Sequence, residues 1–308
     1  MIKALNNTAR PANTHVVLID PQSSASYSGM VPGCVAGLYC SSETKIELLP
    51  LAGWAGIEFI QDYVVDMDTS NKTLTVSSGD IIPYDVTSID IGSTTRGLDT
   101  IPGAKNYTIP TRPISDLVEK IQAEEEQITS KVGAQTIEFV IIGAGAAGIE
   151  LSLAIRARWG NLFKEKGRTD IKLNITVLDS GTHLLPNETE MNQKLVNDAL
   201  AVRNILVLHN CSVKRVEKDF VVLNAEVEGE EPPVVPFTHS IWATGAACHP
   251  LAKKLHERGL ECDDRGWVKV NPTLLSLNCN GVFAAGVRNG FYSTERLAKC
   301  TLMDGVYI

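Results

Sequence analysis

The stretch Ile141-Ile142-Gly143-Ala144-Gly145-Ala146-Ala147-Gly148-Ile149-Glu150 decides the fold. It follows a largely apolar run, Glu138 to Ile142, and precedes a stretch with helical apolar spacing, Ile149 to Arg158. A G-x-G-x-x-G loop between a strand and a helix is typical of a dinucleotide-binding α/β unit. A glycine-rich turn without a ligand is the alternative interpretation.

Each glycine of this loop has a separate physical task. Gly143 permits the tight turn, Gly145 lets the backbone approach a pyrophosphate, and Gly148 lets helix and strand pack closely. Ala146 and Ala147 lie between the last two glycines, where free N–H groups at the helix start receive phosphate charge. The loop is therefore predicted to bind a dinucleotide.

An acidic residue follows at the end of the next apolar run, Leu173 to Asp179. A carboxylate there accepts hydrogen bonds from an adenosine ribose and repels a 2′-phosphate, which favours NADH over NADPH. Asp179 lies 36 residues beyond Gly143, whereas the simple pattern has about 20. The excess predicts an inserted loop between Trp159 and Lys172. An ordinary aspartate at a strand end is the alternative.

Glu150 stands two residues after Gly148. Two interpretations are open for it. Its carboxylate either lies near the nicotinamide carboxamide or is a charge that suits the N-terminal end of the helix dipole.

The two halves of the chain repeat one order of elements. The second half continues with a helix, a strand, a hairpin and a closing strand, at Glu188–Val202, Ile205–His209, Val213–Val216 with Phe220–Leu223, and Ser240–Gly245. The first half has matching runs at His15–Asp20, Ile57–Ile60, Tyr63–Met67 with Leu74–Val76, and Ser88–Gly92. Such a repeat predicts two related nucleotide folds. Asp20 would then hold the ribose of the other dinucleotide, a surface aspartate being the alternative.

A Pro- and Gly-containing stretch, Ile101 to Ser115, is predicted to link the halves. An acidic helix over Leu117 to Glu126 follows, and its run Glu124-Glu125-Glu126 is expected on a solvated face. The first half opens on Ile2 to Arg10, which reads as the end of a helix. Its own glycine loop is therefore expected to precede Met1, or the first nucleotide is bound without that loop.

Composition narrows the class of protein. The chain has 308 residues, 44% apolar and 21% charged, with a net charge of −8. This profile predicts a soluble protein of two domains, with no spanning helix and no nucleic-acid partner. The seven cysteines lack a C-x-x-C pair and the six histidines lack ligand spacing, so no metal site is predicted. The N-terminus lacks an apolar signal core, which predicts a cytoplasmic location and leaves an organelle or peripheral membrane attachment open.

With these motifs in place, the chain resembles the two-dinucleotide flavoproteins of the pyridine nucleotide-disulfide oxidoreductase superfamily. Within that superfamily it is most similar to type II NADH dehydrogenase-like proteins, in particular the branch fused to selenide, water dikinase, with a chain cut short at both ends. The resemblance is carried by six segments: Tyr27–Gly33, Ala36-Gly37, Ile89–Ser93, Gly143–Glu150, Trp242–Ala246 and Asn280–Gly286.

The resemblance implies FAD in the first fold, NAD(H) in the second, and hydride transfer from nicotinamide to flavin. It adds Gly92, Gly245 and Gly286 as cofactor-binding residues. Where the family places an aspartate after the last of these glycines, this chain has Val287 and Arg288. We expect Arg288 either to pair with a phosphate or to lie at the surface.

The resemblance also bears on the electron acceptor. The family's C-x-x-x-x-C disulfide pair is absent from the sequence, which favours direct transfer from flavin to a small acceptor such as a quinone. The family's further C-terminal, interface-forming domain leaves a homodimer and a peripheral membrane association open.

The sequence thus predicts an α/β protein of two nested Rossmann-like three-layer domains with parallel sheets, each with an antiparallel hairpin or meander insertion. Residues 1–108 and 270–308 form the discontinuous FAD-type domain, and residues 109–269 form the NAD(H)-binding domain. The predicted function is an FAD-dependent NAD(P)H:acceptor oxidoreductase, with NADH as the favoured donor. The alternative is a truncated or degenerate NAD(H)-binding paralogue with a sensing or interaction role. No catalytic residue is assigned.

Overall fold

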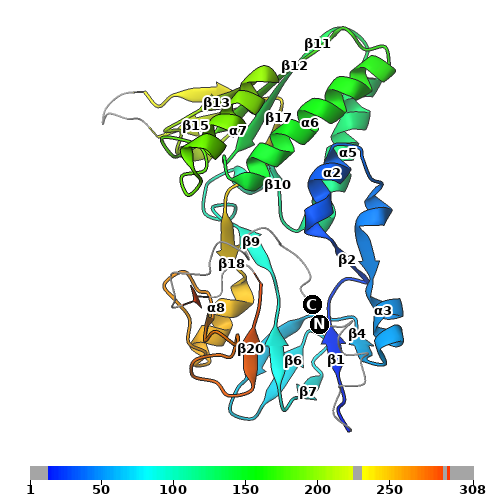
Figure 1. Ribbon diagram of the computed structural model, residues 1–308, viewed down its shortest axis with the longest axis vertical. Helices are drawn as coiled ribbons and strands as arrows, with labels where there is room; N and C mark the ends of the chain where they lie inside the picture. Colours follow the sequence, from blue (N-terminus) through cyan, green and yellow to red (C-terminus); the bar gives the residue numbers. More distant parts are fainter. Residues whose placement is uncertain (1–12, 225–230, 287–289, 292–308) are drawn as a thin grey trace. The chain divides into compact units, whose positions relative to one another are not determined.

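The computed structural model describes residues 13–224, 231–286 and 290–291. The chain forms two compact units (Figure 1). One, here called the glycine-loop unit, comprises Met30–Ser41 and Thr95–Ala246. The other, the split unit, comprises Met1–Gly29, Ser42–Thr94 and Ala247–Ile308. Which dinucleotide each unit binds stays a prediction.

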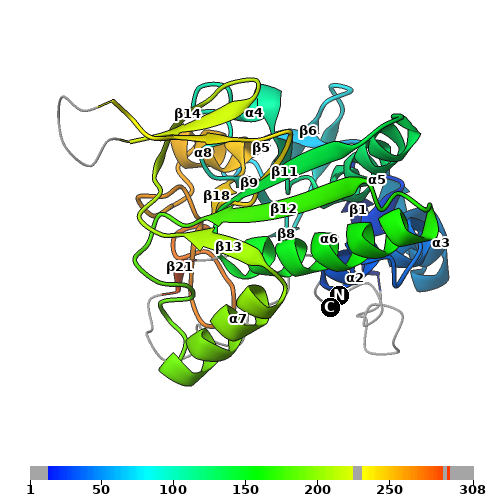
Figure 2. The same cartoon turned by 90° about the horizontal axis from the view of Figure 1, so that it is seen from above.

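A five-stranded parallel sheet is the centre of the glycine-loop unit. Its strand order is β13 (Ile205–Leu208), β12 (Ile171–Leu178), β11 (Gln135–Ile142), β17 (His239–Trp242) and β10 (Ile109–Pro110). Figure 2 shows β11, β12 and β13 side by side. The chain runs outward from β11 in one direction and then returns to the other side of β11 as β17. This reversal creates a topological switch point between β11 and β17.

Strand β11 is apolar on both faces because both are covered. Ile137, Phe139 and Ile141 pack into one core cluster, while Val140 and Ile142 pack into another. All five are at most 3% exposed, and burying each such side chain contributes roughly 1.5–3 kcal/mol. The unit is therefore three layers thick, as predicted.

Helices cover one face and a meander covers the other. The first core cluster includes residues of α2 (Val31–Val35), α5 (Ile114–Ser130), α6 (Ala146–Glu165) and α7 (Glu190–Val202). The second includes residues of the antiparallel sheet and a short helix, namely β14 (Val213–Val216), β15 (Phe220–Leu223), β16 (Val234–Pro236) and α4 (Ala104–Tyr107).

Helix α6 corrects the predicted loop between Trp159 and Lys172. The helix continues to Glu165, because Trp159 and Phe163 are buried on its apolar side at 0% and 5% exposure. It ends where Gly167 takes a left-handed conformation, with φ of 66°. The loop before β12 is therefore shorter than predicted and comprises residues 166–170.

The predicted linker was also wrong, and the predicted solvated face was wrong for Glu125, whereas Glu126 is exposed. The stretch Ile101 to Ser115 contains α4 and supplies β10, the edge strand beside β17. On α5, Glu125 is only 6% exposed. Its carboxylate accepts hydrogen bonds from Arg158 Nε at 3.2 Å and from Trp159 Nε1 at 3.0 Å, so it joins α5 to α6.

The split unit contains shorter parallel pairs and its own meander. Strand β1 (Val17–Ile19) pairs with β4 (Glu58–Ile60), and β8 (Thr87–Ile89) pairs with β20 (Val282–Ala284), both in parallel. The meander consists of β5 (Val64–Asp68), β6 (Thr73–Val76) and β7 (Ile81–Pro83). The remaining elements are β2 (Ser24–Ser26), η1 (Ser28–Met30), η2 (Ser41–Thr44), β3 (Lys45–Glu47), α3 (Leu48–Ala55), β9 (Ser93–Thr95), β18 (Ala246–Cys248), α8 (Pro250–Glu257), β19 (Lys269–Val270) and β21 (Gly290–Phe291).

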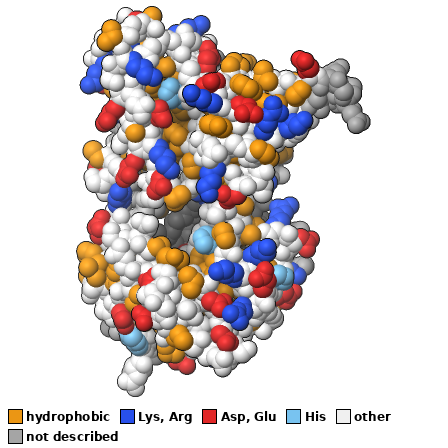
Figure 3. Space-filling model, turned by 180° about the vertical axis from the view of Figure 1, so that it is seen from behind, with side chains coloured by type: hydrophobic (Ala, Val, Ile, Leu, Met, Phe, Trp, Pro, Cys, Tyr) orange, Lys and Arg blue, Asp and Glu red, His pale blue; other side chains and the backbone are white. Residues whose placement is uncertain are grey.

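The fold class predicted from the sequence is thus confirmed, with parallel sheets and an antiparallel insertion in both units. No helix within the described residues is long and apolar enough to cross a lipid bilayer. On the face shown in Figure 3, acidic and basic side chains are interspersed. The predicted end of a helix at Ile2 to Arg10 lies outside the described residues.

Candidate dinucleotide-binding site

The glycine loop connects the end of β11 to the start of α6. Gly143 has φ of 115°, a left-handed conformation, and a Cβ there would lie 2.6 Å from the Ala243 carbonyl oxygen. At Gly148 a Cβ would lie 1.9 Å from the Gly143 carbonyl oxygen. Both positions therefore require glycine, the first for the turn and the second for close packing of helix on loop.

The fold itself does not require glycine at position 145. A Cβ at this position would meet no protein atom within 4 Å, and its φ of −72° is open to any residue. Gly145, Ala146 and Ala147 are all exposed. The backbone N–H groups of the first turn of an α-helix have no partner inside the helix. The space over Gly145 is thus open at a helix end that attracts anions, which fits a pyrophosphate.

The switch point brings Gly245 close to this loop. The turn at Gly143 packs against Ala243 and Thr244, which directly follow β17. A Cβ on Gly245 would lie 3.4 Å from Arg96 Nη2, and the Gly245 carbonyl accepts a hydrogen bond from the Arg96 N–H at 2.8 Å. Ligands of open α/β sheets bind at such switch points, beyond the carboxyl ends of the strands.

Arg96 is a residue that the sequence analysis did not single out. Its main-chain carbonyl accepts hydrogen bonds from Trp242 Nε1 at 2.8 Å and from Thr244 Oγ1. These bonds fix its backbone, while its guanidinium is exposed and donates to the Ala246 carbonyl at 3.4 Å. It supplies a positive charge beside Gly245. A lone arginine in Ser93-Thr94-Thr95-Arg96 gave no sequence signal.

Asp179 lies directly after β12, level with the glycine loop. Leu178 is paired with Ile142 in the sheet, and the Leu178 carbonyl accepts a hydrogen bond from the Gly143 N–H at 2.9 Å. The Asp179 side chain is 14% exposed. The structure therefore places this carboxylate at the same sheet edge as the loop. That is the position from which an acid reaches a ribose in this fold.

Glu150 is exposed on the second turn of α6. Partial desolvation of its carboxyl raises the pKa of Glu150 above its usual range. Both interpretations of Glu150, the charge at the helix N-terminus and the role near the nicotinamide carboxamide, therefore stay predictions.

In the split unit, the predicted residues follow parallel strands. Asp20 follows β1, where burial raises the pKa of its carboxyl and Oδ1 accepts a hydrogen bond from the Gln22 N–H. Gly92 and Gly286 follow the paired strands β8 and β20 and have φ of 66° and 101°. A Cβ on Gly286 would lie 3.0 Å from Asp90 Oδ1. Val287 and Arg288 lie outside the described residues.

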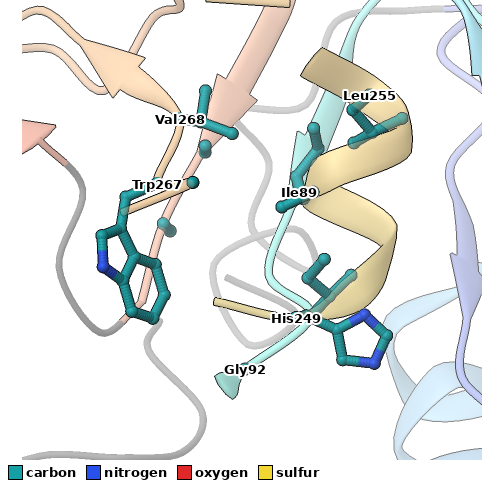
Figure 4. Close-up of a pocket in the computed structure, with 11 residues that line it drawn as sticks. Ile89, Gly92, His249, Leu255, Trp267 and Val268 are labelled. Carbon is teal, nitrogen blue, oxygen red and sulfur yellow. The ribbon is translucent and has the colours of Figure 1, made fainter. Parts of the chain in front are cut away.

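A small pocket opens at the carboxyl ends of β8 and β20. Figure 4 shows Trp267 and Val268 on one side and His249 and Leu255, from the α8 region, on the other. Gly92 contributes to its wall. Burial lowers the pKa of His249, and its Nδ1 accepts the Leu251 N–H at 3.2 Å, which caps α8. The pocket places Gly92 at an apolar cavity of the split unit.

A family model described as pyridine nucleotide-disulphide oxidoreductase matches residues 2–294. The chain belongs to this family. The resemblance deduced from the sequence is therefore confirmed at the level of the family. The narrower branch, fused to selenide, water dikinase, stays a prediction.

Curated relatives and solved structures agree with this membership. Demethylphylloquinone reductase NdbB of Synechocystis sp. is 24% identical over 278 residues, covering 88% of this chain and 63% of the relative. A probable NADH dehydrogenase of Dictyostelium discoideum is 27% identical over 249 residues, covering 74% and 52%. The structure of NDH2 from Plasmodium falciparum in complex with NADH superimposes with a TM-score of 0.74 at 19% identity, covering 88% and 59%. The chain thus spans about half to two thirds of the length of these relatives.

A second solved structure has the same fold. The sulfide:quinone oxidoreductase of Aquifex aeolicus superimposes with a TM-score of 0.75 at 19% identity, covering 93% of this chain and 65% of that one. At this identity the likeness shows the shared fold. The alternative of a non-catalytic NAD(H)-binding paralogue finds no support among these relatives.

Proposed function

We propose that the protein is an FAD-dependent oxidoreductase that takes electrons from NADH and passes them to a quinone. The observation that carries the proposal is the glycine loop at the β11–β17 switch point, with open space over Gly145 and a carboxylate at Asp179. Relatives named as NADH dehydrogenase and quinone reductase support the donor and the acceptor.

NAD(H) belongs, in this proposal, to the glycine-loop unit. Gly145, Ala146 and Ala147 would present the helix N-terminus to the pyrophosphate, and Asp179 would accept the ribose hydroxyls. A carboxylate also repels a 2′-phosphate, so NADH is the expected donor. Arg96 and Gly245 would border the dinucleotide on the β17 side of the switch point.

FAD belongs, in this proposal, to the split unit. Asp20 follows β1 as Asp179 follows β12, so it is the corresponding candidate for the adenosine ribose. Gly92 and Gly286, each in a left-handed conformation after a parallel strand, would let the backbone approach this cofactor.

Bound in this way, FAD would supply the two-electron chemistry, because it would accept a hydride from NADH and could reduce a quinone, which takes up two protons. The chain's own contribution is to bind each dinucleotide at the carboxyl ends of parallel strands and to hold it in a fixed orientation.

The test is the reduction of protein-bound flavin by NADH. The purified protein, supplied with FAD, is expected to be yellow and to lose its visible flavin absorption when NADH is added without oxygen. Gly145→Val is expected to slow the loss of absorption by NADH but not by dithionite, which needs no dinucleotide site. Gly160→Ala, on the same helix, is the matched control because a Cβ there meets nothing within 4 Å.

A protein that binds NADH but no flavin would contradict the proposed enzyme. A flavin that NADH reduces equally well in the Gly145→Val variant would contradict the placement of NADH at this loop.

A further inference from the structure

The Asp179 carboxylate has a side-chain partner, His209, which follows β13 on the neighbouring strand. His209 Nδ1 lies 2.8 Å from Asp179 Oδ2. The two side chains are 14% exposed for the aspartate and 31% for the histidine. The pair is therefore largely enclosed, at the sheet edge where the glycine loop lies.

The hydrogen bonds determine which nitrogen carries the proton. An ionised carboxylate can only accept hydrogen bonds, so Nδ1 of the ring must be the donor. His209 therefore orients the carboxylate through its Nδ1–H group.

The other carboxylate oxygen is held as well. Asp179 Oδ1 accepts a hydrogen bond from the Gly181 N–H at 3.0 Å. Each oxygen thus accepts one bond, and a carboxylate has about four acceptor positions. Two positions remain for the two hydroxyls of a ribose, with the orientation of the carboxylate already fixed.

Backbone hydrogen bonds hold the His209 segment against the Asp179 turn. The Asp179 N–H donates to the Leu208 carbonyl at 2.8 Å, and the Cys211 N–H donates to the Asp179 carbonyl at 2.7 Å. The Asn210 N–H donates to the Gly181 carbonyl at 2.9 Å. The backbone at His209 is therefore fixed by main-chain bonds on both sides, which places its ring beside the Asp179 carboxylate.

The charge of Asp179 is not neutralised by a permanent cation. Within residues 13–224 and 231–286, its carboxylate lies in ion-pair distance of His209 and of no lysine or arginine. A nearby arginine would accommodate the 2′-phosphate of NADPH. The arrangement instead keeps an oriented negative charge where that phosphate would have to lie.

We propose that His209 is a positioning residue that sets the preference for NADH over NADPH by orienting the Asp179 carboxylate toward the adenosine ribose. The inference rests on the proposed function, because it needs NADH in the glycine-loop unit. Its ligand is a nicotinamide dinucleotide with a free 2′-hydroxyl.

The test measures the Kd values of NADH and NADPH by calorimetry for five forms of the protein. These are the wild type, His209→Ala, His209→Asn, Asp179→Ala and the double variant His209→Ala with Asp179→Ala. His209→Ala is expected to raise the Kd of NADH about fivefold, which corresponds to the loss of one net hydrogen bond, and to change the Kd of NADPH by less than about twofold. The NADH preference therefore falls.

Two further results separate positioning from simple structural support. His209→Asn is expected to restore most of the preference, because its amide nitrogen stands close to where Nδ1 stands and can donate to the same oxygen. In the double variant, the histidine change is expected to add nothing to Asp179→Ala, since no carboxylate is left to orient.

Equal weakening of NADH and NADPH in His209→Ala, together with a lower Tm, would overturn the inference and leave His209 as a tie between two strands. An unchanged preference in Asp179→Ala would overturn it too, while leaving dinucleotide binding in place. A wild-type protein that binds neither dinucleotide would instead contradict the proposed function itself.

Discussion

Replacing Gly145 by valine separates ligand binding from folding at the glycine loop. The φ and ψ of Gly145 are −72° and 178°, in the extended region that β-branched residues favour. A Cβ there meets no protein atom within 4 Å. Valine therefore fits the protein, and its side chain occupies only the space that a pyrophosphate would use.

The expected magnitude follows from the hydrogen bonds that valine would block. A hydrogen bond to a charged group contributes about 1.5–3 kcal/mol. Losing one such bond from the helix N-terminus to a phosphate oxygen raises the Kd of NADH about 10- to 150-fold. Stability changes little, because valine is a poorer N-cap than glycine but also restricts the unfolded chain, by about 0.4–1 kcal/mol.

Two measurements on one preparation separate binding from stability. Calorimetry gives the Kd of NADH, and urea unfolding gives the free energy of unfolding. Gly160→Ala, in the middle of the same helix, is expected to bind NADH normally and to gain about 0.5–1 kcal/mol of stability. A Gly145→Val variant with wild-type affinity would refute the reasoning, because the pyrophosphate could not then pass over Gly145.

Three further substitutions test other contacts. Gly148→Ala is expected to lower the free energy of unfolding by about 1–3 kcal/mol, because the new Cβ would lie 1.9 Å from the Gly143 carbonyl oxygen. An unchanged midpoint of urea unfolding would contradict this close approach. Glu125→Ala is expected to lower the free energy of unfolding by about 3 kcal/mol, the lower end of the range for a broken buried ion pair, because Arg158 loses its partner but is 34% exposed. Urea unfolding measures this loss. A loss under about 1 kcal/mol, the value of a surface ion pair, would contradict the buried role of Glu125. Burial lowers the pKa of His249 below the unfolded value of about 6.5, so this group stabilises the fold above that pH and loses its contribution as the pH falls. The wild type should therefore lose more stability than His249→Asn between pH 7 and pH 5, and equal losses would contradict the role of His249 as a cap.

The elements that the sequence predicted well are those with a complete local signal. The hairpin over Val213–Val216 and Phe220–Leu223 has the predicted bounds, because alternation and a short turn determine both strands. The helix predicted over Glu188–Val202 was nearly right and starts at Glu190, after the cap at Thr189. Such patterns are contained within a few neighbouring residues.

The predictions that were wrong concern residues whose structure depends on contacts far away in the sequence. Glu125 belongs to an acidic run typical of a solvated face, yet it is buried by Arg158 and Trp159, which lie 33 and 34 residues further along the chain. Helix α6 continues through Gly160 because Trp159 and Phe163 are anchored in the core around it. Tertiary contacts outweigh the weak helix propensity of one glycine.

The same distinction between local signals and distant contacts applies to the candidate site. Gly143 and Gly148 were predictable because their demands are on the backbone, namely a left-handed turn at the first and a close approach at the second. Backbone demands restrict a position to one residue type, so they leave a motif. Arg96 and His209 contribute through side chains, whose positions depend on the pairing of distant strands, and many residue types suit such places. The glycine loop is therefore visible in the sequence, whereas the proximity of Arg96 to Gly245 and of His209 to Asp179 becomes visible only once the strands of the sheet are paired.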